Sequence, residues 1–157
     1  MQREEFLAAA MESERTLYRV AKTILRSDAD CADAVQEALL KGIKNAPMLR
    51  EKRYVKTWLT RILINTCKDM LRRAGRVQTV ELTDMYAATD RNLERVELYD
   101  ALQALDDKLR LPLVLYYLEG FPMDEVARML RITEGLARRR LWQARKELRE
   151  ILREEAI

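Results

Sequence analysis

Near its C-terminus the sequence gathers arginines within a stretch of helical periodicity. Residues 132–149 hold six cations against two carboxylates, a net charge of +4. The cations are Arg138, Arg139, Arg140, Arg145, Lys146 and Arg149. Guanidinium groups bind phosphates and guanine edges through paired hydrogen bonds, and the free N–H groups of a helix N-terminus also favour anions. The pattern indicates nucleic-acid contact; the alternative is a solvated helix face with ion pairs one turn apart.

A second basic stretch covers residues 50–73, where eight cations outnumber two carboxylates and give a net charge of +6. Tyr54 and Trp58 stand among these cations. Aromatic rings beside cations suit single-stranded or distorted nucleic acid, because bases stack on the rings while the cations neutralise phosphate. Trp58 also shares a helical stripe with Val55 and Ile62, and for that side chain burial in a core is the favoured interpretation.

The opposite charge dominates residues 28–37. Four carboxylates, Asp28, Asp30, Asp33 and Glu37, precede the first cation of this stretch, Lys41. Paired carboxylates can perform acid–base catalysis or bind a hard cation, but these lie on one expected helix and no second element converges on them. A surface that docks a protein partner, or simple helix capping, is favoured over catalysis.

Several classes of chemistry have no residues to support them. The chain has no His and only two cysteines, Cys31 and Cys67, so it supplies neither a His/Cys metal site nor a His-based relay. Both cysteines fall within helical patterns and are expected to be reduced thiols. No stretch approaches the ~18 apolar residues of a membrane span, and the N-terminus lacks the apolar core of a signal peptide. We expect a cytoplasmic protein without enzymatic activity, metal or cofactor.

The elements that position these residues are expected to be helices. Only four Gly and three Pro occur in 157 residues, and apolar positions recur at helical spacing. The first half predicts helices over residues 2–25, from 28 to about 45, and from 55 to about 73. Polar residues 27–30 provide a cap for the second helix, and Gly75 provides a left-handed end for the third.

The second half predicts a further set of helices after a break. Periodicity fades over residues 76–92, in an acidic neighbourhood, and this segment is interpreted as a flexible linker. Helical pattern resumes over residues 93–109, a helix over about 111–118 carries Pro112 in its first turn, and a short helix covers 123–130. Thr133 then caps the long terminal helix. The fold class is therefore all-α, with small helical domains at 1–75 and 93–157, the second containing a helix-turn-helix.

Sequence runs in both halves match a known pattern. The first half contains LYRVA at 17–21, DAVQEA at 33–38, and KTWLTRI at 56–62 followed by Asn65. The second contains LYYLEG at 115–120, EVA at 125–127, and the stretch from EG at 134–135 to ARKELR at 144–149. In this order and spacing, the chain resembles bacterial RNA polymerase sigma factors of the extracytoplasmic-function group, over nearly its whole length.

The resemblance implies a subunit that binds core RNA polymerase, recognises two elements of promoter DNA and assists melting. It places polymerase contact at Asp33, Gln36 and Glu37. It assigns the melted minus-ten element, with one base flipped into a pocket, to Arg53, Tyr54, Lys56, Arg61, Asn65, Lys68 and Arg72. It assigns the minus-thirty-five element to Thr133, Glu134, Gly135, Arg138, Arg139, Arg140 and Arg145. It also implies control by an anti-sigma factor.

The chain departs from the family pattern within the helix-turn-helix. Arg131 stands where members commonly have Gly, and Pro122 stands where Ser or Thr usually caps a helix. Residues 136–140 lack two hydroxyl groups that the family stretch provides, and Arg139 replaces one of them. Two alternatives remain beside the sigma factor: a sigma-like decoy that sequesters an anti-sigma factor, and a stand-alone helix-turn-helix regulator. The cations at both expected DNA sites argue against the decoy, and the first 75 residues argue against the stand-alone regulator.

Overall fold

The computed structural model describes residues 2–46, 50–75 and 93–155, and all regular structure in these ranges is helical. The all-α fold class is therefore confirmed. The chain divides into two compact units, Met1–Val80 and Glu81–Ile157. The predicted linker, residues 76–92, lies outside the described residues.

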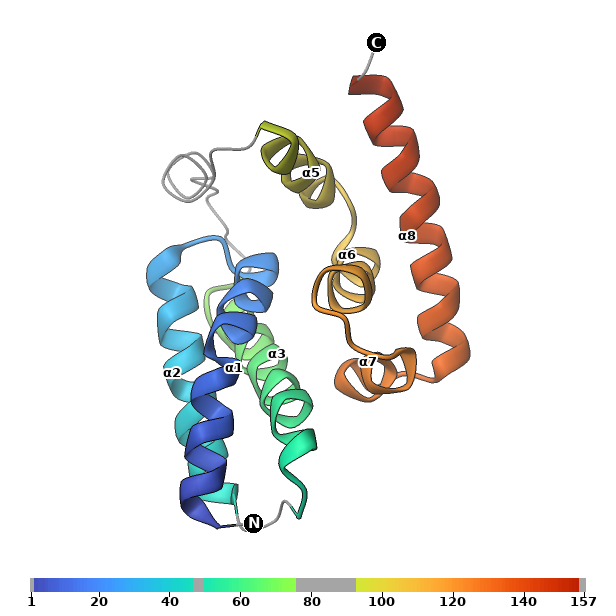
Figure 1. Ribbon diagram of the computed structural model, residues 1–157. Helices are drawn as coiled ribbons and strands as arrows, with labels where there is room; N and C mark the ends of the chain where they lie inside the picture. The colour runs from blue at the N-terminus through green and yellow to red at the C-terminus, as the bar shows by residue number, and fades with distance from the viewer. Residues whose placement is uncertain (1, 47–49, 76–92, 156–157) are drawn as a thin grey trace. The chain divides into compact units, whose positions relative to one another are not determined.

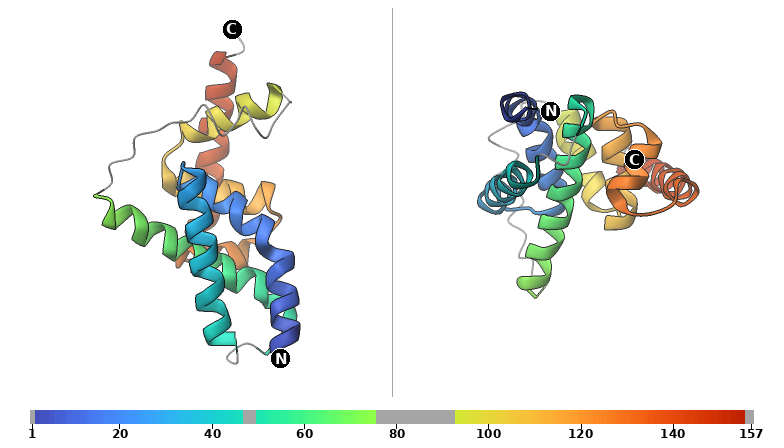
Figure 2. Two further views of the ribbon diagram at one scale, coloured as in Figure 1. Left: turned by 90° about the vertical axis from the view of Figure 1, so that its left-hand side faces the viewer. Right: turned by 90° about the horizontal axis from the view of Figure 1, so that it is seen from below.

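The first unit is built from three long helices. These are α1 (Arg3–Ile24), α2 (Asp28–Asn45) and α3 (Val55–Arg73), with a 3-10 turn, η2 (Lys52–Tyr54), before α3. Each of the three helices packs against the other two, and Figure 2 shows them together from two directions. The largest fully buried side chains at the centre of this bundle include Phe6, Leu17, Leu59, Leu63 and Ile64.

The ends and the closest approach of these helices follow from local chemistry. The Ser27 hydroxyl accepts a hydrogen bond from the N–H of Asp30 at 3.3 Å, and so caps α2 as predicted. Gly75, with φ +66°, follows α3 in the left-handed conformation. Gly42 of α2 faces Leu59 of α3, and a Cβ at position 42 would lie 2.5 Å from Leu59 Cδ2. This glycine lets α2 approach α3 closely.

Not all of the apolar positions predicted for α3 belong to the core. Val55 is buried, but Trp58 and Ile62 are only half-buried. The buried face runs through Leu59 and Leu63, one position further along the chain. The Trp58 ring lies edge-on to Phe6, with ring centroids 6.0 Å apart. Trp58 therefore closes the rim of the bundle.

The second unit consists of shorter elements packed against one long helix, α8 (Glu134–Glu155), drawn in red in Figure 1. The others are α5 (Leu93–Gln103), α6 (Asp107–Leu113), the π-helical turn η3 (Val114–Leu118) and α7 (Met123–Leu130). Helices α5, α6 and α7 all contact α8.

Two predictions about this unit are wrong. A continuous helix over 93–109 is interrupted between α5 and α6, where the buried Arg110 donates hydrogen bonds to the carbonyls of Leu102 (3.0 Å) and Leu105 (2.8 Å). These bonds hold the turn that follows α5, where the Leu102 carbonyl also accepts from the N–H of Leu105 at 3.1 Å. The next helix begins at Asp107, so Pro112 lies beyond its first turn. Because proline has no N–H to donate, the regular bond to the preceding turn is lost there, and η3 follows directly.

Candidate functional site

The turn between α7 and α8 has helix-turn-helix proportions. The N–H of Ile132 donates to the carbonyl of Ala127 at 3.0 Å, the closure of a Schellman motif. Arg131 holds the left-handed position of this turn, with φ 58° and ψ 44°. The Thr133 hydroxyl accepts from the N–H of Leu136 at 3.1 Å and caps α8, as predicted. The left-handed backbone accounts physically for the glycine usual at position 131.

Helix α8 separates a small, apolar buried face from a cationic exposed face. Ala137, Leu141 and Ala144 are buried against the unit. The exposed side chains on the other face are Arg138, Arg139, Trp142, Arg145, Lys146 and Arg149. We call these six residues the α8 cationic face. Small residues on the buried side let the helix pack closely while its long side chains extend outward.

The predicted minus-thirty-five residues do not all share this face. Arg140 is half-buried and lies about 160° around the helix from Trp142, next to the buried Ala144 and outside this face. Glu134 pairs with Arg138 at 2.8 Å, one turn apart, and so offsets part of that charge. Gly135 is exposed, and a Cβ there would meet no other described atom within 4 Å. Packing therefore does not require glycine at this position, which leaves room for close approach of a ligand.

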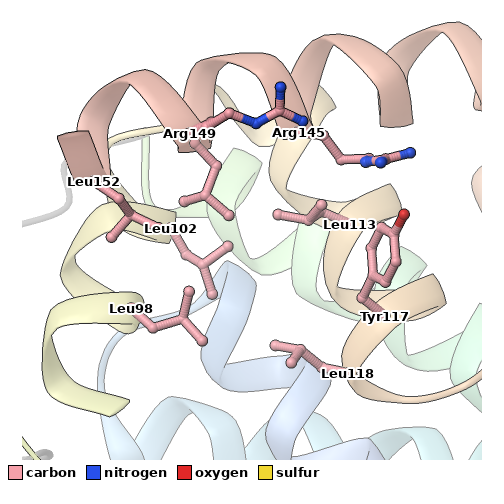
Figure 3. A pocket seen from close by; sticks show the side chains of 9 residues that line it. Leu98, Leu102, Leu113, Tyr117, Leu118, Arg145, Arg149 and Leu152 are labelled. Carbon is pink, nitrogen blue, oxygen red and sulfur yellow. The ribbon is translucent and has the colours of Figure 1, made fainter. Parts of the chain in front are cut away.

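Arg145 also borders a groove that the sequence reasoning missed. The groove has a volume of about 350 Å³ between α5, η3 and α8 (Figure 3). It is lined by Leu98, Leu102, Leu113, Tyr117, Leu118, Arg145, Leu148, Arg149 and Leu152. The guanidinium of Arg145 lies over the Tyr117 ring, 5.7 Å from its centroid. The groove thus has an apolar floor and a basic rim.

The signal for this groove was present in the sequence. Four apolar or aromatic residues occupy consecutive positions 115–118, and one helix face cannot bury all of them. Leu115 is fully buried, whereas Tyr117 is 50% and Leu118 54% exposed. Adjacent exposed apolar side chains of this size are typical of a surface that binds a partner.

In the first unit, α2 presents a polar and acidic outer face. Asp33 and Gln36 are exposed, and Glu37 is half-exposed with Lys41 Nζ 3.5 Å from its carboxylate. Leu40 lies on the same face with 61% of its surface exposed. We call Asp33, Gln36, Glu37 and Leu40 the α2 acidic face. The sequence reasoning found its three polar members and missed the leucine.

Asp28 does not belong to that face. Its carboxylate accepts a hydrogen bond from the Tyr18 hydroxyl at 3.0 Å, and Lys22 Nζ lies 3.3 Å from it. Burial, together with this hydrogen bond, raises the pKa of Tyr18 to about 12, so the phenol stays a donor. Asp28 is therefore paired with a cation of the preceding helix and ties α2 to α1.

The second basic stretch forms an organised stripe along α3. Arg61, Asn65, Lys68 and Arg72 recur at i, i+4, i+7 and i+11, so they follow one side of the helix. Asn65 is half-buried and the three cations are exposed. Lys56 is exposed about 140° around the helix from Arg61 and lies outside this stripe.

Before α3, Arg53 and Tyr54 form a separate pair. The guanidinium of Arg53 lies 4.9 Å from the Tyr54 ring centroid, and its Nε donates to Glu51 at 2.7 Å. The charge of Glu51 raises the pKa of Arg53 above its ordinary value. Both residues of the pair are exposed, so a ring and a cation are available together beside the stripe.

Other kinds of site find no support in the described part of the chain. No three His, Cys, Asp or Glu side chains gather there in a way that could hold a metal ion. Cys31 and Cys67 are free and buried, as expected for reduced thiols, and burial raises the pKa of each to about 12. Such thiols are poor nucleophiles. Among the described helices, none is both long and apolar enough to cross a bilayer.

Comparison with known proteins defines the class. Residues 10–77 match the family model Sigma-70 region 2, and residues 95–148 match Sigma-70, region 4. The ECF RNA polymerase sigma factor SigM of Mycobacterium tuberculosis is 34% identical over 141 residues, covering 88% of this chain and 72% of SigM. The RNA polymerase sigma factor SigV of Bacillus subtilis is 22% identical, covering 93% and 90%. The chain belongs to the ECF RNA polymerase sigma factors.

Solved structures agree on the fold. The sigma factor RpoE of Bartonella quintana, in complex with the anti-sigma factor NepR, matches with a TM-score of 0.84 and 22% identity, covering 96% of this chain and 98% of RpoE. CnrH, in complex with the cytosolic domain of CnrY, matches with a TM-score of 0.71 and 22% identity, covering 97% of each chain. The arrangement of helices described above is thus a sigma-factor fold.

Proposed function

We propose that this chain is a non-enzymatic initiation factor that binds core RNA polymerase in the cytoplasm, directs it to promoters and assists DNA melting. The observation that carries the proposal is the sorting of exposed charge. One acidic helix face lies in the first unit, and a cationic face lies in each unit. A protein partner and two DNA elements account for these three surfaces together.

The α2 acidic face is the proposed polymerase contact. Carboxylates cannot bind phosphate, so this face suits a basic protein surface. Leu40 adds an exposed apolar side chain among Asp33, Gln36 and Glu37. A buried apolar contact surrounded by polar residues is the usual anatomy of a protein interface.

The α3 stripe, together with Arg53 and Tyr54, is the proposed site for the melted minus-ten element. Cations spaced along one helix side can follow a phosphate backbone. The exposed Tyr54 ring offers a platform for an unstacked base, and Asn65 offers an amide for hydrogen bonding. Lys56 would contact a different part of the strand, because it lies on another side of α3.

The α8 cationic face is the proposed reader of the minus-thirty-five element. The N-terminus of α8 carries free N–H groups, an exposed glycine and, within two turns, Arg138 and Arg139. This arrangement fits a helix that enters the major groove. Thr133 contributes through its cap, which holds the first turn of α8 in place.

We further propose that an anti-sigma factor docks in the groove between α5, η3 and α8. The sigma factor RpoE was solved with the anti-sigma factor NepR, and CnrH was solved with the cytosolic domain of CnrY. In this chain the apolar floor suits one face of an amphipathic helix, and Arg145 and Arg149 suit carboxylates on its flank. A bound helix would engage Arg145 and so remove a cation from the DNA-facing side.

Reconstituted transcription tests the proposed function. Core polymerase alone and core polymerase with the purified chain would be given a pool of promoter-length DNA, and run-off transcripts would be sequenced. We expect transcripts with common upstream elements only when the chain is present. Failure of the chain to bind core polymerase at moderate salt would contradict the proposal. Binding without transcription from any DNA would favour the decoy.

A further inference from the structure

An exposed tryptophan occupies the middle of the α8 cationic face. Trp142 is 59% exposed. At about 100° per residue, it lies about 160° around α8 from the buried Ala144 and about 140° from the buried Ala137. The indole therefore points away from the core of its own unit, so packing does not explain a residue of this size here.

The cations lie on both sides of the indole. Arg138 and Arg145 lie about 40° and 60° from it on one side of the helix wheel, and Lys146 and Arg139 lie about 40° and 60° from it on the other. Lys146 Nζ is 5.5 Å from the centroid of the Trp142 ring, a cation–π contact that restricts the ring. A rigid apolar surface is thus held between two rows of positive charge.

This arrangement has a direct geometric consequence in a DNA groove. A helix with its side chains is about as wide as the major groove of B-DNA, roughly 12 Å. When the exposed face enters the groove, side chains at its flanks meet the phosphate walls, and the side chain at its centre meets the base edges. Here the flanks are Arg and Lys, and the centre is Trp142.

Indole chemistry limits what this central position can read. The ring has one N–H donor and no acceptor, so it cannot form the paired hydrogen bonds with which Arg reads guanine or Asn reads adenine. The apolar feature of the major groove is the 5-methyl group of thymine. We propose that Trp142 is a specificity-determining residue that contacts a thymine methyl in the upstream promoter element. The inference rests on the proposed function, since it requires α8 to enter DNA.

The experiment pairs a protein change with the removal of a single methyl group. Full-length chain with core polymerase would be used to select upstream elements from random DNA. Each thymine of the selected element would then be replaced by uracil, which lacks only the methyl, and binding would be measured for wild type, Trp142→Ala and Trp142→Phe. Circular dichroism would check that the variants keep their helical content.

For wild type we expect uracil to weaken binding about fourfold at one or two positions, the effect of one buried methyl group. Trp142→Ala should weaken binding to thymine DNA by at least that factor and should be insensitive to uracil at those positions. Trp142→Phe should keep part of the sensitivity. The salt dependence of binding should be the same for wild type and Trp142→Ala, because no charge is lost.

The outcomes separate this inference from the function on which it rests. If wild type selects an upstream element and Trp142→Ala selects the same bases with equal affinity and equal uracil sensitivity, the role of Trp142 is overturned while the sigma function stands. If wild-type holoenzyme selects no upstream element, the proposed role of α8 fails and this inference fails with it. The contact is supported if uracil weakens wild-type binding at one or two positions, and if Trp142→Ala weakens binding to thymine DNA by at least that factor and is insensitive to uracil at the same positions.

Discussion

Helices α2 and α8 have the same arrangement of apolar residues and differ in charge. Both bury small side chains and hold a single large apolar residue opposite the buried face. The buried small residues are Cys31, Ala34, Ala38 and Gly42 in α2, and Ala137 and Ala144 in α8. The exposed apolar residues are Leu40 at 61% and Trp142 at 59%. What differs is the charge around them, acidic in α2 and cationic in α8.

The difference shows how one helical scaffold serves two classes of partner. The small buried residues decide how closely each helix packs on its own unit, and they have no bearing on what the helix binds. Partner class follows from the sign of the flanking charges, because phosphates repel carboxylates and attract guanidinium groups. The central apolar residue then supplies contact area that the surrounding charges align.

The largest expected effect comes from inverting the charge on α2. In the double variant Asp33→Arg with Glu37→Arg, the α2 acidic face would repel a basic partner surface and would lose two hydrogen-bond acceptors. We expect core-polymerase affinity to fall more than about 100-fold, since unfavourable charge juxtaposition costs several kcal/mol. Fluorescence anisotropy of labelled chain titrated with core polymerase measures this loss.

A matched pair on α1 controls for the change in net charge. Glu12→Arg with Glu14→Arg alters the same number of exposed carboxylates in the same unit, away from the α2 acidic face. We expect its polymerase affinity to stay within about twofold of wild type, as for rim charges that a partner does not touch. Equal losses in both pairs would mean that bulk charge, and no particular face of α2, controls docking.

Truncation of the central leucine is expected to have the next largest effect. Leu40→Ala removes an exposed apolar side chain, so stability should change little while polymerase affinity falls about tenfold, the effect of losing one well-buried leucine contact. Promoter DNA binding by the free chain should not change. An unchanged polymerase affinity, measured by the same titration, would restrict the docking face to its polar residues.

On the cationic face, a single arginine has a smaller effect with a distinct signature. Arg139→Ala should weaken DNA binding about fivefold and reduce the slope of log affinity against log salt by about 0.9, the contribution of one phosphate contact. Filter binding at several salt concentrations gives this slope. Lys108→Ala removes an exposed cation of α6 in the same unit and should leave the slope unchanged. If the two slopes are equal, Arg139 is only a solvated charge.

The features predicted correctly from the sequence are those that depend on local residues. Ser27 and Thr133 cap helices through bonds to N–H groups three residues later, so a short window of sequence contains both partners. The cationic positions of α8 follow from a helical period that its alanines mark. Asp33 and Gln36 were named from the family resemblance, and the structure shows that both are exposed.

Two kinds of feature were not predicted from the sequence. The first is contacts between residues distant in sequence, and the second is large apolar side chains that are exposed. The pairing of Asp28 with Lys22 joins two helices, and the bonds from Arg110 close a break that periodicity does not reveal. Leu40 and Trp142 occupy exposed positions, where a polar residue would be equally compatible with the fold. Apolar patterning assigns such residues to a core by default, and only their measured exposure separates them from it.

The smallest expected effect concerns how α8 is positioned, and here the two helices differ again. Ser27 leads into α2 from an extended backbone, whereas α8 follows a left-handed Arg131. A side chain in that conformation has a steric cost that glycine avoids, so Arg131→Gly should raise the free energy of unfolding by about 0.5–1 kcal/mol. Urea denaturation followed by circular dichroism measures the change.

The same substitution three residues earlier should have the opposite sign. Arg128 is exposed in the body of α7, where glycine loses helix propensity, so Arg128→Gly should lower stability by about 1 kcal/mol. Opposite signs at positions 128 and 131 would assign the effect to backbone conformation, because both variants lose the same side chain. If Arg131→Gly is also destabilising, the side chain of Arg131 stabilises the turn by more than its left-handed backbone costs. In that case this arginine, which is absent from the usual family pattern, helps to position α8.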